Sequence, residues 1–227
     1  MANEKEKDNK IVRPHLIVCE GLDAKKYLIY FLQHLIKDDP RYDNFQVMDG
    51  KGITDLPLFL KTLPDLPNFN IVKTLTIIRD SETDSANADK SVRQMLKKCK
   101  FTAPDSPCAV AAPSVGNHPV AVGYALFPEL NKIEGKGTLE DLCLETLAGE
   151  KSEELLKIVH CAIKSVNEQF GALERPHKNE LHTYLSLTDK FVGLKLGESA
   201  NTGAFDFSAR EVEPLKNLLC SMLEQTP

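Results

Sequence analysis

Residues 15–23 read His-Leu-Ile-Val-Cys-Glu-Gly-Leu-Asp, and this stretch decides the fold of the chain. Its first five residues are almost all apolar, which is typical of a strand buried on both faces in a parallel sheet. The run ends at Glu20-Gly21, and apolar residues then recur at helical spacing as far as Ile36. A buried strand followed at once by an amphipathic helix predicts the first unit of an α/β fold.

The same alternation of strand and helix continues over the first hundred residues. Residues 45–48 and 75–78 are further short apolar runs, and helical patterns follow from Asp55 and from Ala86. Strands that alternate with helices favour a parallel sheet with right-handed crossovers. One more strand is expected at residues 120–127, after a proline-rich stretch that predicts loops.

The chain therefore divides into three predicted parts. Residues 1–10 are polar and charged, and we expect a disordered N-terminal segment there. Residues 11–135 should form an α/β core with a mostly parallel sheet. Residues 136–227 carry mostly helical patterns, so we expect a mainly helical C-terminal part packed on the core.

Charge and cysteine usage exclude some classes of protein. The net charge of −5 argues against a module that binds nucleic acid through positive charge alone. The six cysteines lie mostly in apolar surroundings and show no zinc-site or redox-pair spacing, so we expect buried free thiols. There is no signal-peptide pattern and no apolar run near the roughly 20 residues of a membrane span. These features predict a cytoplasmic protein without a membrane partner.

Acidic residues follow each of the first three predicted strands. Glu20 follows the first, Asp49 the second, and residues 80–84 (Asp-Ser-Glu-Thr-Asp) the third. The carboxyl ends of parallel strands meet at one edge of a sheet, where ligands bind. Clustered carboxylates repel one another unless a cation neutralises them, and hard oxygen ligands favour Mg²⁺ or Mn²⁺. The alternatives are a surface charge at Glu20 and a solvated loop at 80–84 that caps the next helix.

Two of these segments resemble the motifs of the Toprim domain. Residues 16–23 resemble its first motif, a strand followed by Glu-Gly and acids at a helix start, and residues 75–82 resemble its second, a strand ending in Asp-x-Asp. Over residues 12–223 the chain resembles stand-alone bacterial Toprim-like proteins of a domain-of-unknown-function family, related to the Toprim domains of OLD nucleases. The later signatures are residues 137–145, the helix at Lys178 and residues 197–207.

This resemblance implies a Rossmann-like Toprim core that binds Mg²⁺ or Mn²⁺ and hydrolyses phosphodiesters in nucleic acid, in the manner of a nuclease. Carried over to this sequence, Glu20, Asp80 and Glu82 would hold the metal. Glu20 would also act in catalysis by moving a proton. By their order in the chain, Glu140 matches a further metal ligand and Lys178 a catalytic lysine.

Two departures from the family pattern keep an alternative open. Ala24 stands where many relatives carry a second acid, and Glu82 stands at the second aspartate of Asp-x-Asp. The alternative is a non-catalytic Toprim-like module that binds metal, a nucleotide or nucleic acid. OLD nucleases carry an ATPase on the same chain, whereas this chain lacks the Gly-x-x-x-x-Gly-Lys-Ser/Thr loop. By analogy, a separately encoded ATPase is then the expected partner.

Two further residues have competing interpretations. Lys51 lies between two glycines after the second predicted strand, where it can reach a phosphate, and it is the candidate cofactor-binding residue. It can equally be an ordinary surface lysine. Glu140 lies in Thr-Leu-Glu-Asp (residues 138–141), which is also typical of a helix start, so it can serve as a capping residue instead of a metal ligand.

Overall fold

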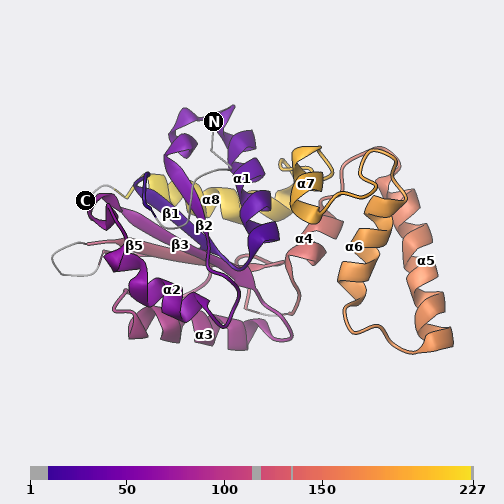
Figure 1. The fold of residues 1–227 in the computed structure, drawn as a ribbon, viewed down its shortest axis with the longest axis horizontal. Helices are drawn as coiled ribbons and strands as arrows, with labels where there is room; N and C mark the ends of the chain where they lie inside the picture. The colour runs from indigo at the N-terminus through magenta and orange to yellow at the C-terminus, as the bar shows by residue number, and fades with distance from the viewer. Residues whose placement is uncertain (1–9, 114–118, 134, 226–227) are drawn as a thin grey trace.

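Four strands run parallel in one five-stranded sheet, whose order is β2-β1-β3-β5-β4 (Figure 1). The structure is a computed structural model that describes residues 10–113, 119–133 and 135–225. The parallel strands are β1 (His15–Cys19), β2 (Phe45–Asp49), β3 (Thr74–Asp80) and β5 (Ala121–Phe127), and the short β4 (Val110–Ala111) pairs antiparallel with β5. Nearly all of the predicted disordered segment, residues 1–10, lies outside the described residues.

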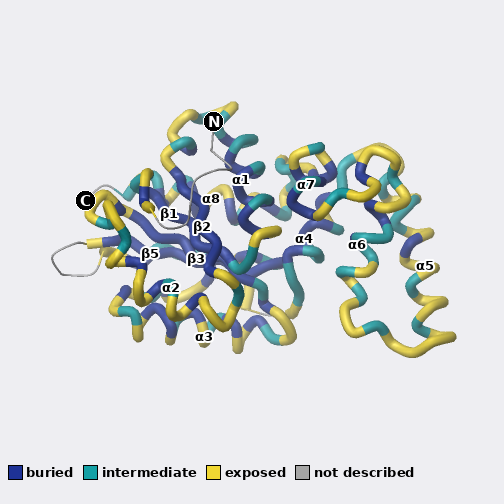
Figure 2. The backbone as a smooth tube through the Cα atoms, viewed as in Figure 1, coloured by how far each residue is buried: buried dark blue, intermediate teal, exposed yellow. Residues whose placement is uncertain are grey.

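Helices cover both faces of the sheet because side chains alternate along each buried strand. In β1, Ile17 and Cys19 join the apolar cluster with α1 (Leu22–Ile36) and α8 (Glu213–Leu223). Leu16 and Val18 join the cluster with α2 (Leu56–Thr62) and α3 (Ser85–Lys98). The sheet is therefore the middle of three layers, and it is buried on both faces (Figure 2).

The remaining helices follow β5. They are α4 (Leu139–Glu145), α5 (Ser152–Phe170), α6 (Pro176–Ser186) and α7 (Leu196–Asn201). Short 3-10 helices occupy Pro40–Asn44, Leu63–Asp65, Phe69–Ile71 and Arg210–Val212. Helices α5 and α6 lie side by side as a hairpin that extends away from the sheet, whereas α7 packs against α1 (Figure 1).

The predicted α/β class, mostly parallel sheet and helical C-terminal portion are confirmed. Strand β4 differs from the prediction, because it lies in the proline-rich stretch for which the sequence predicts loops. A strand of two residues is too short to show the alternation by which strands are recognised. Along the described ranges, we find no helix with the length and apolar character needed to cross a membrane.

Candidate metal centre

The first and third acidic segments meet because β1 and β3 are neighbours in the sheet. Cys19, the last residue of β1, is in register with Ile78 of β3, and the backbone N–H of Glu20 donates to the carbonyl of Ile78 at 3.2 Å. Asp80 ends β3 two residues later. Both acids therefore stand at the carboxyl edge of the sheet, where open α/β folds bind their ligands.

Asp80 is a half-buried acid at this edge of the sheet. One of its carboxylate oxygens, Oδ1, accepts a hydrogen bond from the backbone N–H of Leu139 at 2.9 Å. Burial and, to a smaller extent, the negative charges of Glu20, Glu140 and Glu82 together raise the pKa of Asp80 to about 8, while the hydrogen bond from Leu139 opposes the shift. Acids from three separate segments thus act on one carboxyl group, as the sequence predicted for this edge.

Glu20 is also largely buried, with 12% of its side chain exposed. Burial raises its pKa, the neighbouring charge of Arg79 opposes that shift, and Glu82 adds to it. The Nε of Arg79 lies 3.8 Å from Oε2 of Glu20. Arg79 was not singled out in the sequence, although its place directly before Asp80 in a buried strand was the available signal.

Glu82 belongs to a loop that pairs with the segment before α4. Its backbone exchanges two hydrogen bonds of 2.8 Å with Gly137, and its φ of 57° lies in the left-handed region. The Glu82 side chain is exposed and lines the same cleft as Asp80. Because the Glu82 side chain is exposed and is longer than that of an aspartate, it can change conformation more easily than the other predicted ligands.

Glu140 does not cap α4, although capping was the alternative interpretation of this residue. Asp141 caps α4 instead, since its Oδ2 accepts from the backbone N–H of Thr138 at 2.7 Å. Glu140 faces α6, where its Oε1 lies 3.5 Å from Nζ of Lys178. The structure therefore brings the predicted ligand Glu140 and the predicted catalytic Lys178 together. Asp84, in contrast, caps α3, as the alternative for residues 80–84 expected.

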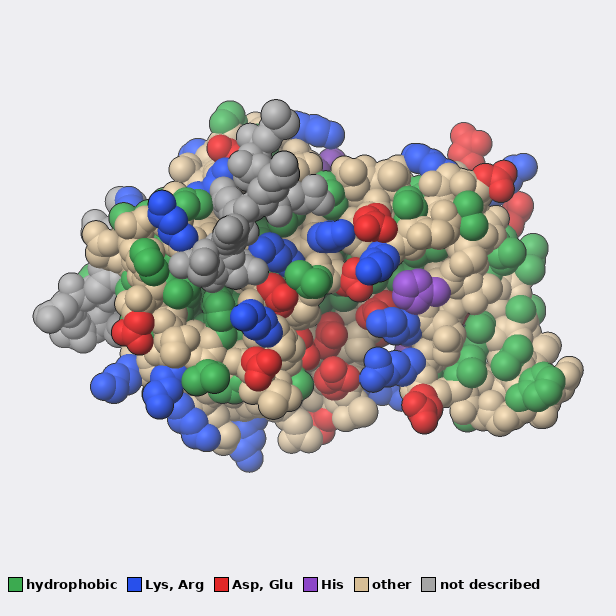
Figure 3. All heavy atoms as spheres, viewed as in Figure 1, with side chains coloured by type: hydrophobic (Ala, Val, Ile, Leu, Met, Phe, Trp, Pro, Cys, Tyr) green, Lys and Arg blue, Asp and Glu red, His purple; other side chains and the backbone are tan. Residues whose placement is uncertain are grey.

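A cleft of about 380 Å³ lies between the acids Asp80, Glu82 and Glu140 and the start of α6, and Glu20 is not among its described lining residues. Its cationic side is formed by Lys136, Arg175 and Lys178, and His177 Nδ1 lies 2.7 Å from Oδ1 of Asp141. Acidic side chains gather at the middle of this face, with Lys and Arg side chains beside them (Figure 3). Neither Lys136 nor Arg175 could be singled out from the sequence, because Lys136 reaches the acids through the backbone pairing of Gly137 with Glu82, and Arg175 through the packing of α6 against α4.

Lys51 is not among the described residues that line this cleft. Its backbone has a φ of 61° and donates to Oδ1 of Asp49 at 2.8 Å, and the same oxygen accepts from Gly21 at 3.1 Å. Asp49 therefore ties together the loops after β1 and β2. The Lys51 side chain is exposed, and its contact with a phosphate stays a prediction.

The residues present suit a divalent ion chemically but are not assembled around one. In the described part of the chain, no three His, Cys, Asp or Glu side chains are grouped as a ready metal site. Oε2 of Glu20 is buried without a hydrogen-bond partner, and the 3.8 Å between it and Nε of Arg79 is longer than a hydrogen bond, so this oxygen can still accept a polar ligand or a metal ion. Carboxylate oxygens are the ligands that Mg²⁺ and Mn²⁺ prefer. The exposed Glu82 can move to complete such a group.

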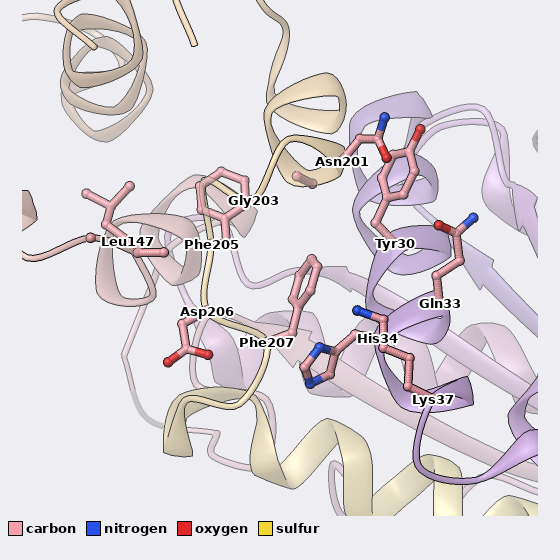
Figure 4. Close-up of a pocket in the computed structure, with 13 residues that line it drawn as sticks. Tyr30, Gln33, His34, Lys37, Leu147, Asn201, Gly203, Phe205, Asp206 and Phe207 are labelled. Carbon is pink, nitrogen blue, oxygen red and sulfur yellow. The ribbon is translucent and has the colours of Figure 1, made fainter. Parts of the chain in front are cut away.

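A larger cavity of about 500 Å³ lies elsewhere, between the second half of α1, the end of α7 and the segment that precedes α8 (Figure 4). Phe205 and Phe207 form its apolar part, while His34 and Lys37 enter from α1. Asp206 is the one acid among its described lining residues. Since it lacks a carboxylate cluster, this cavity does not suit the predicted metal chemistry.

The three layers and the acidic cleft define an α/β protein with a charged site at the carboxyl edge of a parallel sheet. The chain belongs to the family described as "Protein of unknown function (DUF3226)", whose model matches residues 14–224. No curated protein and no solved structure matches the chain. The family description states no activity, so the resemblance to Toprim domains and OLD nucleases stays a prediction.

Proposed function

We propose that the chain is a cytoplasmic, Mg²⁺-dependent phosphodiester hydrolase of the Toprim type that acts on nucleic acid. One observation carries the proposal: half-buried Asp80 feels the charges of Glu20, Glu82 and Glu140 and lines a cleft with a cationic wall. Crowded carboxylates repel one another, and the ion pairs of Glu20 with Arg79 and of Glu140 with Lys178 leave Asp80 and Glu82 without a cationic partner in the described residues, so their presence at a ligand-binding edge favours a function that needs them.

Each residue has a role that its position permits. Glu20, Asp80, Glu82 and Glu140 would hold the ion, and a bound Mg²⁺ supplies activation of water and neutralises charge on a phosphate. Glu20 would accept the proton of the attacking water. Burial raises the pKa of Glu20, and a carboxylate with a higher pKa is a stronger base.

The cationic wall supports a phosphate substrate. Lys136, Arg175 and Lys178 line the cleft although the chain as a whole carries a net charge of −5. Local cations opposite acids are the arrangement expected where an anionic substrate has to approach a metal ion. Lys178, which is paired with Glu140 at 3.5 Å, would turn to the phosphate and stabilise the charge that develops in the transition state.

Cleavage assays with matched variants test this function. Purified protein would be incubated with Mg²⁺ or Mn²⁺ and with single-stranded DNA, duplex DNA or RNA. We expect cleavage by the wild type and by Asp105→Asn, an exposed acid that does not line the cleft, and a loss of at least about 100-fold in Glu20→Gln and Asp80→Asn. Cleavage that persists in both site variants, or that does not depend on metal, would refute the proposal.

The second candidate is a non-catalytic module that binds metal, a nucleotide or nucleic acid and works with a separately encoded ATPase. The ion pair between Arg79 and Glu20 favours it, because a guanidinium that is 5% exposed already neutralises part of the charge that a metal would neutralise. For this module we expect binding of Mn²⁺ or of an oligonucleotide without cleavage of any substrate. An Arg79→Gln variant that gains cleavage would show that the arginine restrains a competent site.

A further inference from the structure

A carboxylate–imidazole pair lies in the candidate cleft, between α4 and the first turn of α6. Nδ1 of His177 lies 2.7 Å from Oδ1 of Asp141, and both residues line the cleft together with Asp80. The Asp141 side chain is 14% exposed, whereas that of His177 is 52% exposed. The carboxylate is therefore the buried member of the pair, and the imidazole is the member that a substrate can reach.

The fold holds Asp141 in one orientation. Its second oxygen, Oδ2, accepts from the backbone N–H of Thr138 at 2.7 Å and from the Thr138 hydroxyl at 3.2 Å. The two carboxylate oxygens thus have separate partners, one at the start of α4 and one at the start of α6. A carboxylate held in this way fixes both the orientation and the tautomer of the imidazole that donates to it.

The other ring nitrogen of His177, Nε2, is available to a ligand. In the described part of the chain, Asp141 is the one polar partner of the His177 ring, and it takes Nδ1. The cations Lys136, Arg175 and Lys178 line the same cleft. A phosphate that these cations attract is therefore brought to the side of the cleft where Nε2 is free.

Asp80 lies between this pair and Glu20. Glu20 follows β1, which flanks β3 on one side, whereas α4, which carries Asp141, contacts β5 on the other side of β3. In-line displacement at phosphorus requires the attacking water and the leaving oxygen to lie on opposite sides. A base at Glu20 and an acid at His177, on the two flanks of Asp80, agree with that requirement.

We propose that His177 is the general acid for the leaving oxygen and that Asp141 is its positioning residue, an inference that rests on the proposed hydrolase function. The ring starts protonated, with Nδ1–H donated to Asp141. As water attacks phosphorus, Glu20 takes one of the water protons and the bond from phosphorus to the leaving oxygen breaks. The electron pair of that bond stays on the leaving oxygen, which takes the proton from Nε2. His177 is then neutral, with its remaining proton on Nδ1, and it regains a proton from solvent.

Two substrates with different leaving groups test this role in the presence of Mn²⁺. Cleavage of single-stranded DNA expels a strongly basic alkoxide that needs a proton, whereas bis(p-nitrophenyl) phosphate expels a weakly basic phenolate that does not. His177→Gln should cleave the DNA at least about 100-fold more slowly than the wild type but the phenyl ester within about threefold of it, because Gln has no proton to give. The matched control is His160→Gln, which removes an exposed His–Glu180 pair away from the cleft and should match the wild type on both substrates.

The outcomes separate this inference from the proposed function. Equal losses on both substrates in His177→Gln, or full cleavage of DNA by this variant, overturn the role of His177 and leave the hydrolase in place. A wild type that cleaves neither substrate refutes the hydrolase, and the inference falls with it. Circular dichroism would confirm that each variant folds.

The tautomer of His177 gives a readout that does not depend on cleavage. In ¹⁵N NMR of the whole chain, we expect the neutral ring to carry its proton on Nδ1, because Asp141 accepts it. In Asp141→Asn the amide oxygen can still accept from Thr138, while the amide N–H₂ faces the ring and should move the proton to Nε2. A neutral wild-type ring protonated on Nε2, or a tautomer that Asp141→Asn leaves unchanged, overturns the positioning role of Asp141.

Discussion

The Asp80 carboxylate accepts a hydrogen bond from the backbone N–H of Leu139 across 59 residues of sequence, at 2.9 Å. This contact joins the last residue of β3 to the first turn of α4. It fixes Asp80 beside Glu140, the next residue along α4, and so holds two predicted ligands at one place. The acids of the cleft are therefore positioned by the fold itself, against their mutual repulsion.

Replacing Asp80 by Asn should stabilise the protein at alkaline pH. The pKa of Asp80 is raised to about 8, so the native state binds a proton more tightly than the unfolded chain, whose Asp pKa is about 3.9. The wild type therefore loses stability as the pH rises from about 4 to about 8, and Asp80→Asn does not. We expect the variant to exceed the wild type by at least about 1 kcal/mol at pH 8.

Urea unfolding at several pH values measures this difference. Asn can still accept the hydrogen bond from Leu139, so the variant keeps the contact and loses only the charge. Asp105→Asn, an exposed acid, should follow the wild type at every pH. A difference between Asp80→Asn and wild type that is the same at pH 4 and pH 8 would contradict the assigned burial and repulsion.

Manganese should raise the melting temperature of the wild type but not of Asp80→Asn. An ion that binds only the native state, present at a concentration about 100 times its dissociation constant, stabilises the protein by about 2.7 kcal/mol. For a domain of this size that free energy corresponds to a rise in melting temperature of roughly 5 to 10 °C. Thermal unfolding followed by circular dichroism, with and without MnCl₂, gives the measurement. An equal shift in both proteins would mean that manganese binds away from Asp80.

The edge of the sheet that carries the acids could be predicted from the sequence. Short apolar runs that end in Glu20 and Asp80 imply parallel strands, and parallel strands bring their ends together whatever the details of packing. Periodicity likewise located α1 and α3, because their buried faces repeat at helical spacing. These are local signals that tertiary contacts reinforce.

The cationic side of the cleft could not be predicted in the same way. Arg175 and Lys136 are far apart in sequence from Asp80. Arg175 approaches it because α6 packs against α4, and Lys136 because the next residue, Gly137, pairs with the backbone of Glu82. Sequence periodicity says that a helix has a buried face but not which helix covers it. The sequence also does not tell which of Glu140 and Asp141 caps α4 and which faces the cleft, since adjacent acids at a helix start satisfy the same capping pattern.

His15 should make the protein less stable in mild acid. It is buried in β1, its Nδ1 lies 2.9 Å from Oγ1 of Thr74, and burial, with a smaller effect of Lys73, lowers its pKa to about 4. The unfolded chain binds a proton near pH 6.5, so stability is complete above that pH and falls as the pH drops toward 4. Relative to His15→Asn, the wild type should lose up to about 3 kcal/mol over this interval.

The control for this experiment is His160→Asn, since the His160 side chain is 70% exposed. Its stability should change with pH as that of the wild type does. Chemical unfolding at pH 7, 5.5 and 4 is sufficient, because only the change with pH matters and not the constant cost of removing a buried ring. If His15→Asn loses as much free energy of unfolding between pH 7 and pH 4 as the wild type does, groups other than His15 cause that loss.

Gly197 is a position where alanine should destabilise a helix. Alanine usually stabilises helices relative to glycine by up to about 1 kcal/mol. At Gly197 in α7, however, an added Cβ would lie 2.4 Å from Cβ of Lys26 in α1, an atom that cannot move without the backbone. We expect Gly197→Ala to lower the free energy of unfolding by about 1 to 3 kcal/mol, because α7 must shift away from α1.

Urea unfolding of Gly197→Ala, of Lys26→Gly and of the double variant Gly197→Ala/Lys26→Gly separates the two contributions. Removing the Lys26 side chain leaves room for the new methyl group, but it also places glycine within α1 at a cost of about 1 kcal/mol. If crowding causes the loss, the two substitutions will be less destabilising together than the sum of their separate effects. Strict additivity would instead mean that α7 adjusts freely, and that its packing on α1 is loose enough to accept a larger residue.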